Sequence, residues 1–144
     1  GRGLATTLHA FIAGRRGRGR GTLVGIASVG GIRGLRGSGA SCASRAAAMS
    51  DCESLRGELR GSGVRVVTVA QGFVDTPLTR RSDFSMPQLW SAGRAASHIL
   101  ARLPKRPLEI NFPALFTWGL RLLGALPGRW RLKLGQRLAR QPQE

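Results

Sequence analysis

The sequence predicts an α/β fold with a parallel sheet of about three strands, flanking helices and two further helices at the C-terminal end. Two observations lead to this fold class. Short runs of apolar and β-branched residues recur along the 144 residues, as in strands buried within a parallel sheet. Segments with helical spacing of apolar residues alternate with these runs, which is typical of α/β folds. The length suits about one domain.

The first expected elements are a helix and a basic turn. Residues 4–13 form the helix, because Leu4, Leu8 and Phe11 recur at spacings of four and three and so share one face. Residues 15–21 (RRGRGRG) form the turn that leads into the first strand, because glycine alternates there with arginine.

The remaining elements continue the alternation of helix and strand. The expected strands are residues 22–27 (TLVGIA), 64–70 (VRVVTVA) and 108–112 (LEINF). The expected helices after the first strand are residues 41–61, 91–103, 114–126 and 130–140. The expected loops are the glycine-rich residues 28–39 and residues 72–87.

A pattern of polar residues begins where the first expected strand ends. Ser28 closes that strand, Ser41 follows thirteen positions later, and Arg45 follows after four more, within SCASRAAA. Two further stretches come in order, ESLRGELRGSGVRVVTVA at 53–70 and QGFVDTPLT at 71–79. Together these stretches resemble the short-chain dehydrogenase/reductase family, which has a catalytic Ser, a Tyr-x-x-x-Lys helix and a Pro-Gly loop with a Thr at this spacing.

The resemblance implies an oxidoreductase that acts on a carbonyl or alcohol substrate, with two replacements in its active site. In the family the Ser orients the substrate oxygen, the Tyr is the general acid/base, and the Lys lowers the Tyr pKa. Ser28 keeps its identity, Ser41 stands for the Tyr and Arg45 for the Lys, and the chain contains no Tyr. A serine hydroxyl is a poorer proton donor than a phenol of pKa about 10, and general acid–base catalysis is worth about 10²–10⁴-fold. We therefore expect this chain to be impaired or inactive.

The resemblance also implies NAD or NADP as the cofactor. In the family the Lys holds the nicotinamide ribose, and the loop after the next strand lines the nicotinamide. Those roles fall on Arg45, Gly72 and Thr76, with Gln71 in place of the family's Pro.

The half of the family fold that binds pyrophosphate has no counterpart in the sequence. Its glycine-rich turn opens a helix, whereas GRGRG at 17–21 precedes an expected strand. We expect a partial Rossmann-like, doubly wound sheet in a truncated chain, with residues 1–113 as the C-terminal half of the domain and 114–144 as a helical extension. The strand at 22–27 would then be an exposed edge, covered by an upstream segment or by a second copy in a homo-oligomer.

The charge leaves alternatives to the enzyme open. Lys and Arg number 23 against 7 Asp and Glu, giving +16. One interpretation is a surface that binds polyanions; the other is a compositional bias, since the arginines are scattered rather than clustered. Residues 114–126 are apolar and precede a basic helix, which would suit weak contact with a membrane surface or packing on the protein itself. A catalytically dead interaction protein is the remaining alternative, and we expect no specific nucleic-acid partner.

Composition excludes several other classes. Cys42 and Cys52 would lie about 15 Å apart along one helix, too far for a disulfide, so we expect thiols and a cytoplasmic protein. The two His and two Cys have no ligand spacing, so we expect no metal site. A nucleophile elbow of a serine hydrolase needs a glycine where Ile26 stands. Asp75 is expected to order the loop around Thr76.

Overall fold

A computed structural model of the chain describes residues 2–32, 39–77, 79–81 and 88–130. The helices are α1 (Arg2–Gly17), α2 (Gly39–Glu58), α3 (Ala92–Arg102) and α4 (Ala114–Ala125). The strands are β1 (Gly21–Ser28), β2 (Val64–Gln71), β3 (Val74–Asp75), β4 (Trp90–Ser91) and β5 (Glu109–Phe112). Short 3₁₀ turns cover Val29–Gly31, Thr79–Arg81 and Leu103–Lys105. The predicted α/β class is confirmed.

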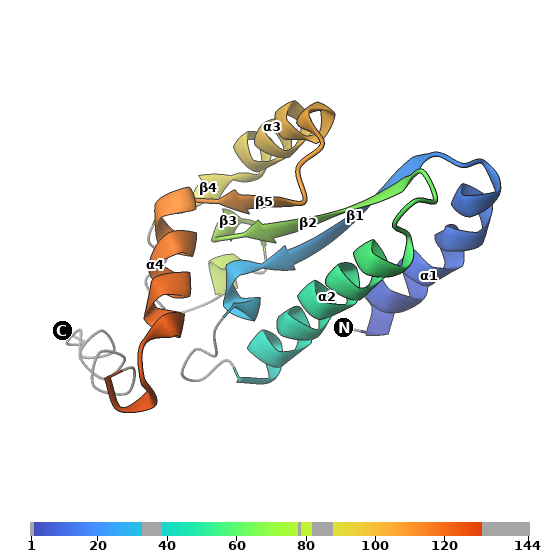
Figure 1. Cartoon of the computed structure of the whole chain (residues 1–144). Coiled ribbons are helices and arrows are strands. Elements are labelled where there is room, and N and C mark those ends of the chain that lie inside the picture. The colour runs from blue at the N-terminus through green and yellow to red at the C-terminus, as the bar shows by residue number, and fades with distance from the viewer. Residues whose placement is uncertain (1, 33–38, 78, 82–87, 131–144) are drawn as a thin grey trace.

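The main sheet has three parallel strands in the order β1-β2-β5. Strand β2 lies in the centre, and β1 is an edge of this sheet in the described part of the chain (Figure 1). The register pairs Ser28 with Gln71 and Gln71 with Phe112, so the carboxyl ends of all three strands form one row. Ile26 on the edge strand is 54% exposed, as a strand that lacks a neighbour on one side would be.

Helices cover both faces of the sheet. Helices α1 and α2 lie on one face and α3 on the other (Figure 1). Strand β2 alternates between the two sides, with Val64 and Val66 in the core under α1 and α2, and Val67 and Val69 in the core under α3. This alternation explains why its sequence reads as a continuous apolar run.

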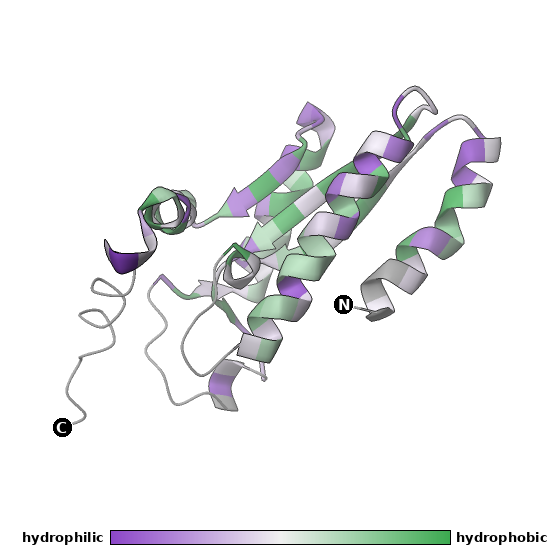
Figure 2. Cartoon of the chain, turned by 60° about the horizontal axis from the view of Figure 1, so that its bottom comes forward, coloured by the Kyte–Doolittle hydropathy of each residue, from purple (hydrophilic) through white to green (hydrophobic). Residues whose placement is uncertain are grey.

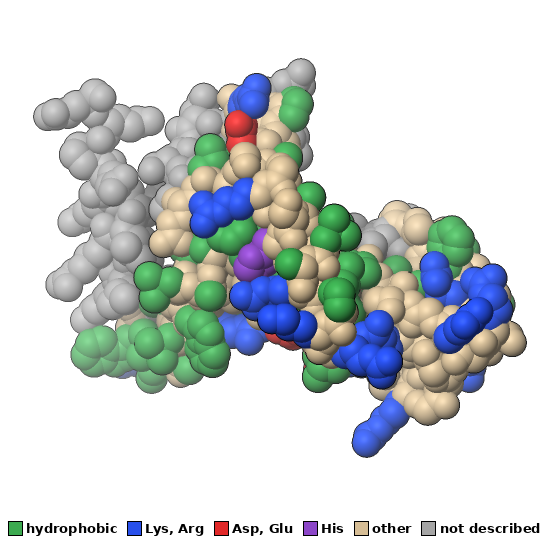
Figure 3. Space-filling model, turned by 90° about the horizontal axis from the view of Figure 1, so that it is seen from above, with side chains coloured by type: hydrophobic (Ala, Val, Ile, Leu, Met, Phe, Trp, Pro, Cys, Tyr) green, Lys and Arg blue, Asp and Glu red, His purple; other side chains and the backbone are tan. Residues whose placement is uncertain are grey.

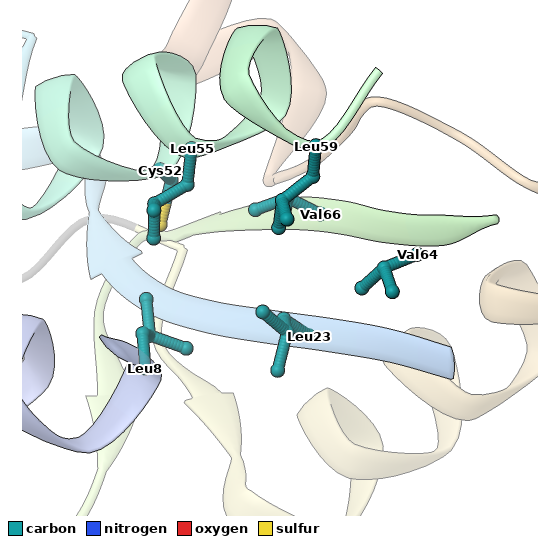
Figure 4. Close-up of a cluster of buried hydrophobic side chains, with 7 residues drawn as sticks. All are labelled: Leu8, Leu23, Cys52, Leu55, Leu59, Val64 and Val66. Carbon is teal, nitrogen blue, oxygen red and sulfur yellow. The ribbon is translucent and has the colours of Figure 1, made fainter. Parts of the chain in front are cut away.

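The core between α1, α2 and the sheet is built from side chains that point toward one another (Figure 4). It consists of Leu8, Leu23, Cys52, Leu55, Leu59, Val64 and Val66. Leu55 is fully buried, and burial of a leucine side chain is worth about 2 kcal/mol. The core on the other face consists of Val67, Val69, Val74, Ala95, Ile110 and Phe112.

Helix α1 differs from the expectation in two respects. It continues through Gly17, so the first residues of the expected basic turn are helical; alanine and arginine favour helix strongly enough to carry it past Gly14, and the chain turns at Gly19, where φ is +64°. Phe11 is 57% exposed rather than packed, and Ile12 joins Leu8 against the core instead.

The expected loop at 72–87 contains one strand of a second, small sheet, and the other strand follows the loop. Strands β3 and β4 pair in parallel, Val74 with Trp90 and Asp75 with Ser91. Two-residue strands carry no periodic pattern, so the sequence pattern did not predict them. The helix expected at 130–140 lies almost wholly outside the described residues. No helix in the ranges above is long and apolar enough to span a membrane.

Candidate functional site

The positions singled out in the sequence gather at the carboxyl ends of the strands. In open α/β sheets ligands bind in the crevice outside these ends. Ser28 is the last residue of β1, and Gly72 directly follows Gln71, the last residue of β2. The parallel pairing of β1 and β2 places Ser28 beside Gln71. The predicted positions Ser28 and Gly72 therefore lie at the same end of the sheet, although they are far apart in the sequence.

Ser28 closes its strand and starts the 3₁₀ turn that follows. Its backbone is extended, and its Oγ accepts a hydrogen bond from the Gly30 N–H at 3.3 Å. This capping contact is the ordinary structural role of a serine at a helix start. It also fixes the hydroxyl at the rim of the sheet, where it remains half-buried.

Two glycines bring this turn against α2. A Cβ on Gly31 would lie 2.8 Å from the Arg45 carbonyl carbon and 2.9 Å from the Ala46 nitrogen, so only glycine lets the turn approach the helix backbone. A Cβ on Gly30 would lie 3.4 Å from Arg45 Nη1, 3.7 Å from Ser28 Oγ and 3.8 Å from Cys42 Sγ. Ser28, Cys42 and Arg45 therefore surround one small glycine.

Ser41 lies on α2, one helical turn before Arg45. Residues four apart on a helix are neighbours on its surface, so Ser41 and Arg45 share a face. Ser41 is exposed and Arg45 half-buried, and the Ser41 carbonyl accepts a hydrogen bond from the Ser44 hydroxyl at 2.9 Å. The hydroxyl at position 41 thus stands at the solvent rim, while the guanidinium reaches inward to Gly30.

Gly72 is held by the strand beside it. Its N–H donates to the Phe112 carbonyl at 2.7 Å, and a Cβ there would lie 2.6 Å from Pro113 Cδ. A glycine is therefore needed at this position for packing, independently of any ligand. The peptide bond between Phe112 and Pro113 is cis.

Thr76 lies in a loop ordered by threonine hydroxyls. Thr79 Oγ1 accepts the Thr76 N–H at 2.8 Å and donates to the Val74 carbonyl at 2.8 Å. The two hydroxyls lie 3.2 Å apart. Asp75 accepts two hydrogen bonds from Arg80, at 2.7 and 3.0 Å, and these hold the pKa of Asp75 below its usual value.

The sequence pattern missed two members of this arrangement. Cys42 is buried and lies within 4 Å of the Gly30 position, and its spacing of three from Arg45 was the signal that it shares a face with that residue. Thr79 organises the loop around Thr76, and no motif distinguishes it from other loop threonines.

Other reactive side chains lie in ordinary structural surroundings. Cys42 and Cys52 form no disulfide, and burial raises the pKa of the Cys52 thiol. His9 contacts Asp51 across α1 and α2 at 3.4 Å, and His98 packs on Trp90 and Phe112. No group of three or more potential metal ligands occurs among the side chains that the structure describes.

Comparison with known proteins decides the family. The short chain dehydrogenase family model matches residues 2–85, which include Ser28, Ser41, Arg45, Gly72 and Thr76. The chain belongs to the short chain dehydrogenase family. An uncharacterized oxidoreductase from Myxococcus xanthus is 38% identical over 125 residues, which are 87% of this chain and 49% of that protein. The chain thus spans about half the length of this relative.

Solved structures of the same family share the fold. A short chain dehydrogenase from Burkholderia cenocepacia in complex with NADP has a TM-score of 0.73 at 27% identity, over 93% of this chain and 53% of that one. A short-chain dehydrogenase from Sphingobium yanoikuyae in complex with NADPH has a TM-score of 0.64 at 24% identity, over 97% and 54%. The expected partial Rossmann-like sheet of this family is confirmed.

The residues present fit one end of a nicotinamide dinucleotide. Arg45 supplies guanidinium donors and Ser28 a hydroxyl, and Gly72 follows the end of β2 at the same rim of the sheet. The G-x-G-x-x-G fingerprint, which binds pyrophosphate in dinucleotide folds, does not occur in the sequence, and the glycine-rich loop after β1 does not match it. The fit therefore extends to the nicotinamide and its ribose.

Proposed function

We propose that the chain is the C-terminal part of an NAD(P)-dependent oxidoreductase for a carbonyl or alcohol substrate, with turnover impaired by the serine at position 41. One observation carries the proposal. Ser28 and Arg45 converge on Gly30 at the carboxyl end of the sheet, at the family's spacing. The group that should lie between them and the substrate is a short hydroxyl at the solvent rim.

The chemistry divides between the cofactor and the chain. The nicotinamide, when bound, supplies or takes up the hydride. Ser28 Oγ would orient the substrate oxygen by a hydrogen bond, and Arg45 would hold the ribose hydroxyls through its guanidinium N–H groups. The proton at the substrate oxygen lacks a phenol donor, and a serine hydroxyl neither reaches as far nor releases a proton as readily.

The test begins with the intact mass of the protein from its native source, because the chain spans about half of its relatives. Oxidation of NADPH is then followed with a panel of aldehydes and ketones, using the whole native protein. We expect a rate at background. The double variant Ser41→Tyr/Arg45→Lys should raise kcat by about a hundredfold or more, since it restores the acid/base.

A matched control separates this effect from a new aromatic side chain. Ser50 is also exposed and on α2, and Ser50→Tyr should leave the background rate unchanged. Robust turnover by the parent protein that survives Ser41→Ala would contradict the proposed impairment, and loss of NADPH binding on Ser28→Ala alone would contradict its assigned role toward the substrate.

A second candidate function is attachment to an anionic membrane surface. Leu115, Trp118 and Leu122 on α4 are 78%, 68% and 72% exposed and follow a spacing of three and four. Apolar side chains gather at this end of the molecule in Figure 3. Arg129 and Trp130 follow α4, and such a combination of apolar stripe, tryptophan and arginine suits the interface of an anionic bilayer.

Sedimentation with lipid vesicles tests this candidate. The chain should pellet with phosphatidylglycerol vesicles and remain in solution with neutral phosphatidylcholine vesicles. Trp118→Ser should reduce the bound fraction several-fold, whereas Leu100→Ser, at a residue of α3 that is 66% exposed, should not. Equal losses for both variants would count against a role of α4.

A further inference from the structure

A hollow rich in arginine lies at the other end of the sheet, where β1 and β2 begin. Its volume is about 830 Å³, and it lies between the turn that joins α1 to β1 and the turn that joins α2 to β2. The arginines that line it are Arg15, Arg18, Arg20, Arg60, Arg65 and Arg106. Figure 3 shows basic side chains gathered at this end, far from the apolar side chains of α4. Figure 2 shows the hydrophilic character of the turn after α1.

Among the residues that the structure describes, none that lines the hollow is acidic. Neither Asp nor Glu is among its lining residues, and none of the six arginines takes part in the ion pairs found among the described residues. Like charges at this density repel one another, and they repel most where they are partly buried. An arrangement of this kind is favoured when a bound anion neutralises it.

Two guanidinium atoms that belong to arginines lining the hollow are buried and lack a hydrogen-bond partner. They are Arg15 Nε and Arg65 Nη1. The other terminal nitrogen of Arg65 donates to Thr22 Oγ1 at 3.0 Å, so this guanidinium is fixed with one donor satisfied and one free. A buried donor without an acceptor is costly, and an anion in the hollow would supply acceptors once these two side chains turned toward it.

The backbone holds the two turns face to face. A Cβ on Gly63 would lie 1.8 Å from the Gly19 carbonyl oxygen, so the turns touch at that point. Gly19, Gly61 and Gly63 have positive φ values of 64°, 81° and 76°, a backbone conformation that glycine adopts without strain. Arg18 and Arg20 on one turn are thereby set opposite Arg60 on the other.

We propose that this hollow binds a small anion that carries several linked phosphate groups. Arginine pairs with phosphate through two parallel hydrogen bonds. Because the arginines lie on two facing turns, an anion with more than one phosphate group could contact both turns at once. The volume lies within the usual range of small-molecule sites, about 300–1,000 Å³. The hollow is distinct from the Ser28–Arg45 site, because the eight residues of β1 separate the two by roughly 23 Å at 3.3 Å per residue.

Calorimetric titration of the full chain with inorganic tripolyphosphate tests the proposal. At an ionic strength of about 0.15 M, where distant charges are screened, we expect saturable binding of one anion per chain, and weaker binding of orthophosphate. If ATP binds as tightly as tripolyphosphate, the site recognises only the phosphate groups. Tighter binding of ATP would show that it also contacts the nucleoside. Both results support the site.

Two double variants separate the hollow from net charge. Arg18→Gln/Arg60→Gln removes two exposed arginines that line the hollow, and Arg16→Gln/Arg129→Gln removes two exposed arginines that do not. Both change the charge equally. The first should weaken tripolyphosphate binding about tenfold or more, the second less than about twofold, and Ser28→Ala at the other end of the sheet should have no effect.

Three results would overturn the proposal. The first is no binding, and the second is equal weakening by the two double variants. The third is tight binding only of long single-stranded RNA, with affinity that rises with length, because that would indicate an extended basic surface. The circular dichroism spectrum of each double variant, and of each of its single substitutions, is compared with that of the parent chain, so that loss of folding is recognised.

Discussion

The two ends of the sheet are built differently. At the carboxyl end, two glycines allow close packing: Gly31 lies against the backbone of α2 at Arg45 and Ala46, and Gly72 lies against the Pro113 ring. At the amino end, the turns also meet at a glycine, Gly63, but around an open hollow lined by arginines. Under the proposed function, the carboxyl end holds Ser28 and Arg45 where the family has its catalytic Ser and Lys, with Ser41 in place of the phenol. The packing at the carboxyl end therefore does not depend on which side chain stands at position 41. The amino end instead carries arginines whose charge the packing does not require.

The largest expected effect comes from placing a methyl group where the turn after β1 meets the backbone of α2. Gly31→Ala would put a Cβ within 3 Å of three backbone atoms of Arg45 and Ala46, which cannot move without displacing α2. We expect a loss of about 3 kcal/mol in the free energy of unfolding, the upper range for overpacking, measured by urea denaturation.

The control for Gly31 lies on the helix that it touches. Gly57 on α2 has nothing within 4 Å of its Cβ position, and Gly57→Ala should leave stability unchanged or raise it by up to about 1 kcal/mol. A loss below about 1 kcal/mol in Gly31→Ala would mean that the turn is not wedged against α2, and that the carboxyl end is no more tightly packed than the amino end.

A smaller loss in the free energy of unfolding is expected when Arg56 is replaced, because its guanidinium is hydrogen-bonded while the nearby arginines of the hollow form no ion pair among the described residues. Arg56 on α2 donates to the Val66 carbonyl at 3.2 Å, to Thr68 Oγ1 at 2.9 Å and to the Leu108 carbonyl at 2.9 Å. It thus ties the helix to β2 and to the residue before β5. Arg56→Ala should cost about 2 kcal/mol, the range for hydrogen bonds from a charged group.

Arg60 provides the comparison, four residues further along the chain. It is exposed and lines the hollow, so Arg60→Ala should change stability by less than about 0.5 kcal/mol. Unfolding of both variants in urea at one pH measures the difference. Equal losses would show that the arginines at the amino end of the sheet are structural, which would weaken the distinction between the two ends.

The layers of this fold follow from local sequence, and its small elements do not. The strands in the sheet were predictable because β2 presents alternate residues to two apolar cores and is therefore apolar throughout. Strands β3 and β4 were not, because each has two residues and exists only through its pairing with the other. Phe11 was predicted from its spacing to share a face with Leu8, but Leu8 and Ile12 occupy the face that meets α2 and the sheet.

The candidate site shows the same division. The spacing of Ser28 and Arg45 predicted their positions, since one ends a strand and the other lies in the second turn of the helix that follows. The contacts that join them could not be predicted, because the approach of Gly30 and Gly31 to α2 depends on the tertiary fold. The contact of Cys42 with that turn and the hydrogen bonds of Thr79 are likewise set by folding. The hollow at the amino end was also unforeseen, because Arg65 and Arg106 join the basic turn only in three dimensions.

The smallest expected effect is a dependence of stability on pH at the carboxyl end of β5. His98 on α3 stacks edge-on against Trp90 and Phe112, with ring centroids 5.2 Å from each. Burial lowers its pKa, and the positive charges of Arg102 and Arg94 lower it further. Its Nε2 is buried without a hydrogen-bond partner in the structure, so a proton there would be poorly accommodated.

The sign of the effect follows from linkage. Because the pKa of His98 is lower in the folded than in the unfolded chain, the unfolded chain takes up the proton first as pH falls. The stabilising contribution is present above the unfolded value of about 6.5 and is lost as pH falls from there through the folded pKa. His98→Phe fills the same aromatic cluster without titrating, so stability between about pH 5 and 7 should vary less with pH than in the parent. Urea unfolding across this range measures the pH dependence of stability, and an NMR titration of the His98 ring measures its pKa in the folded chain. A folded pKa at or above the ordinary value would show that the ring is solvated. The carboxyl end would then be less tightly packed than its glycines indicate.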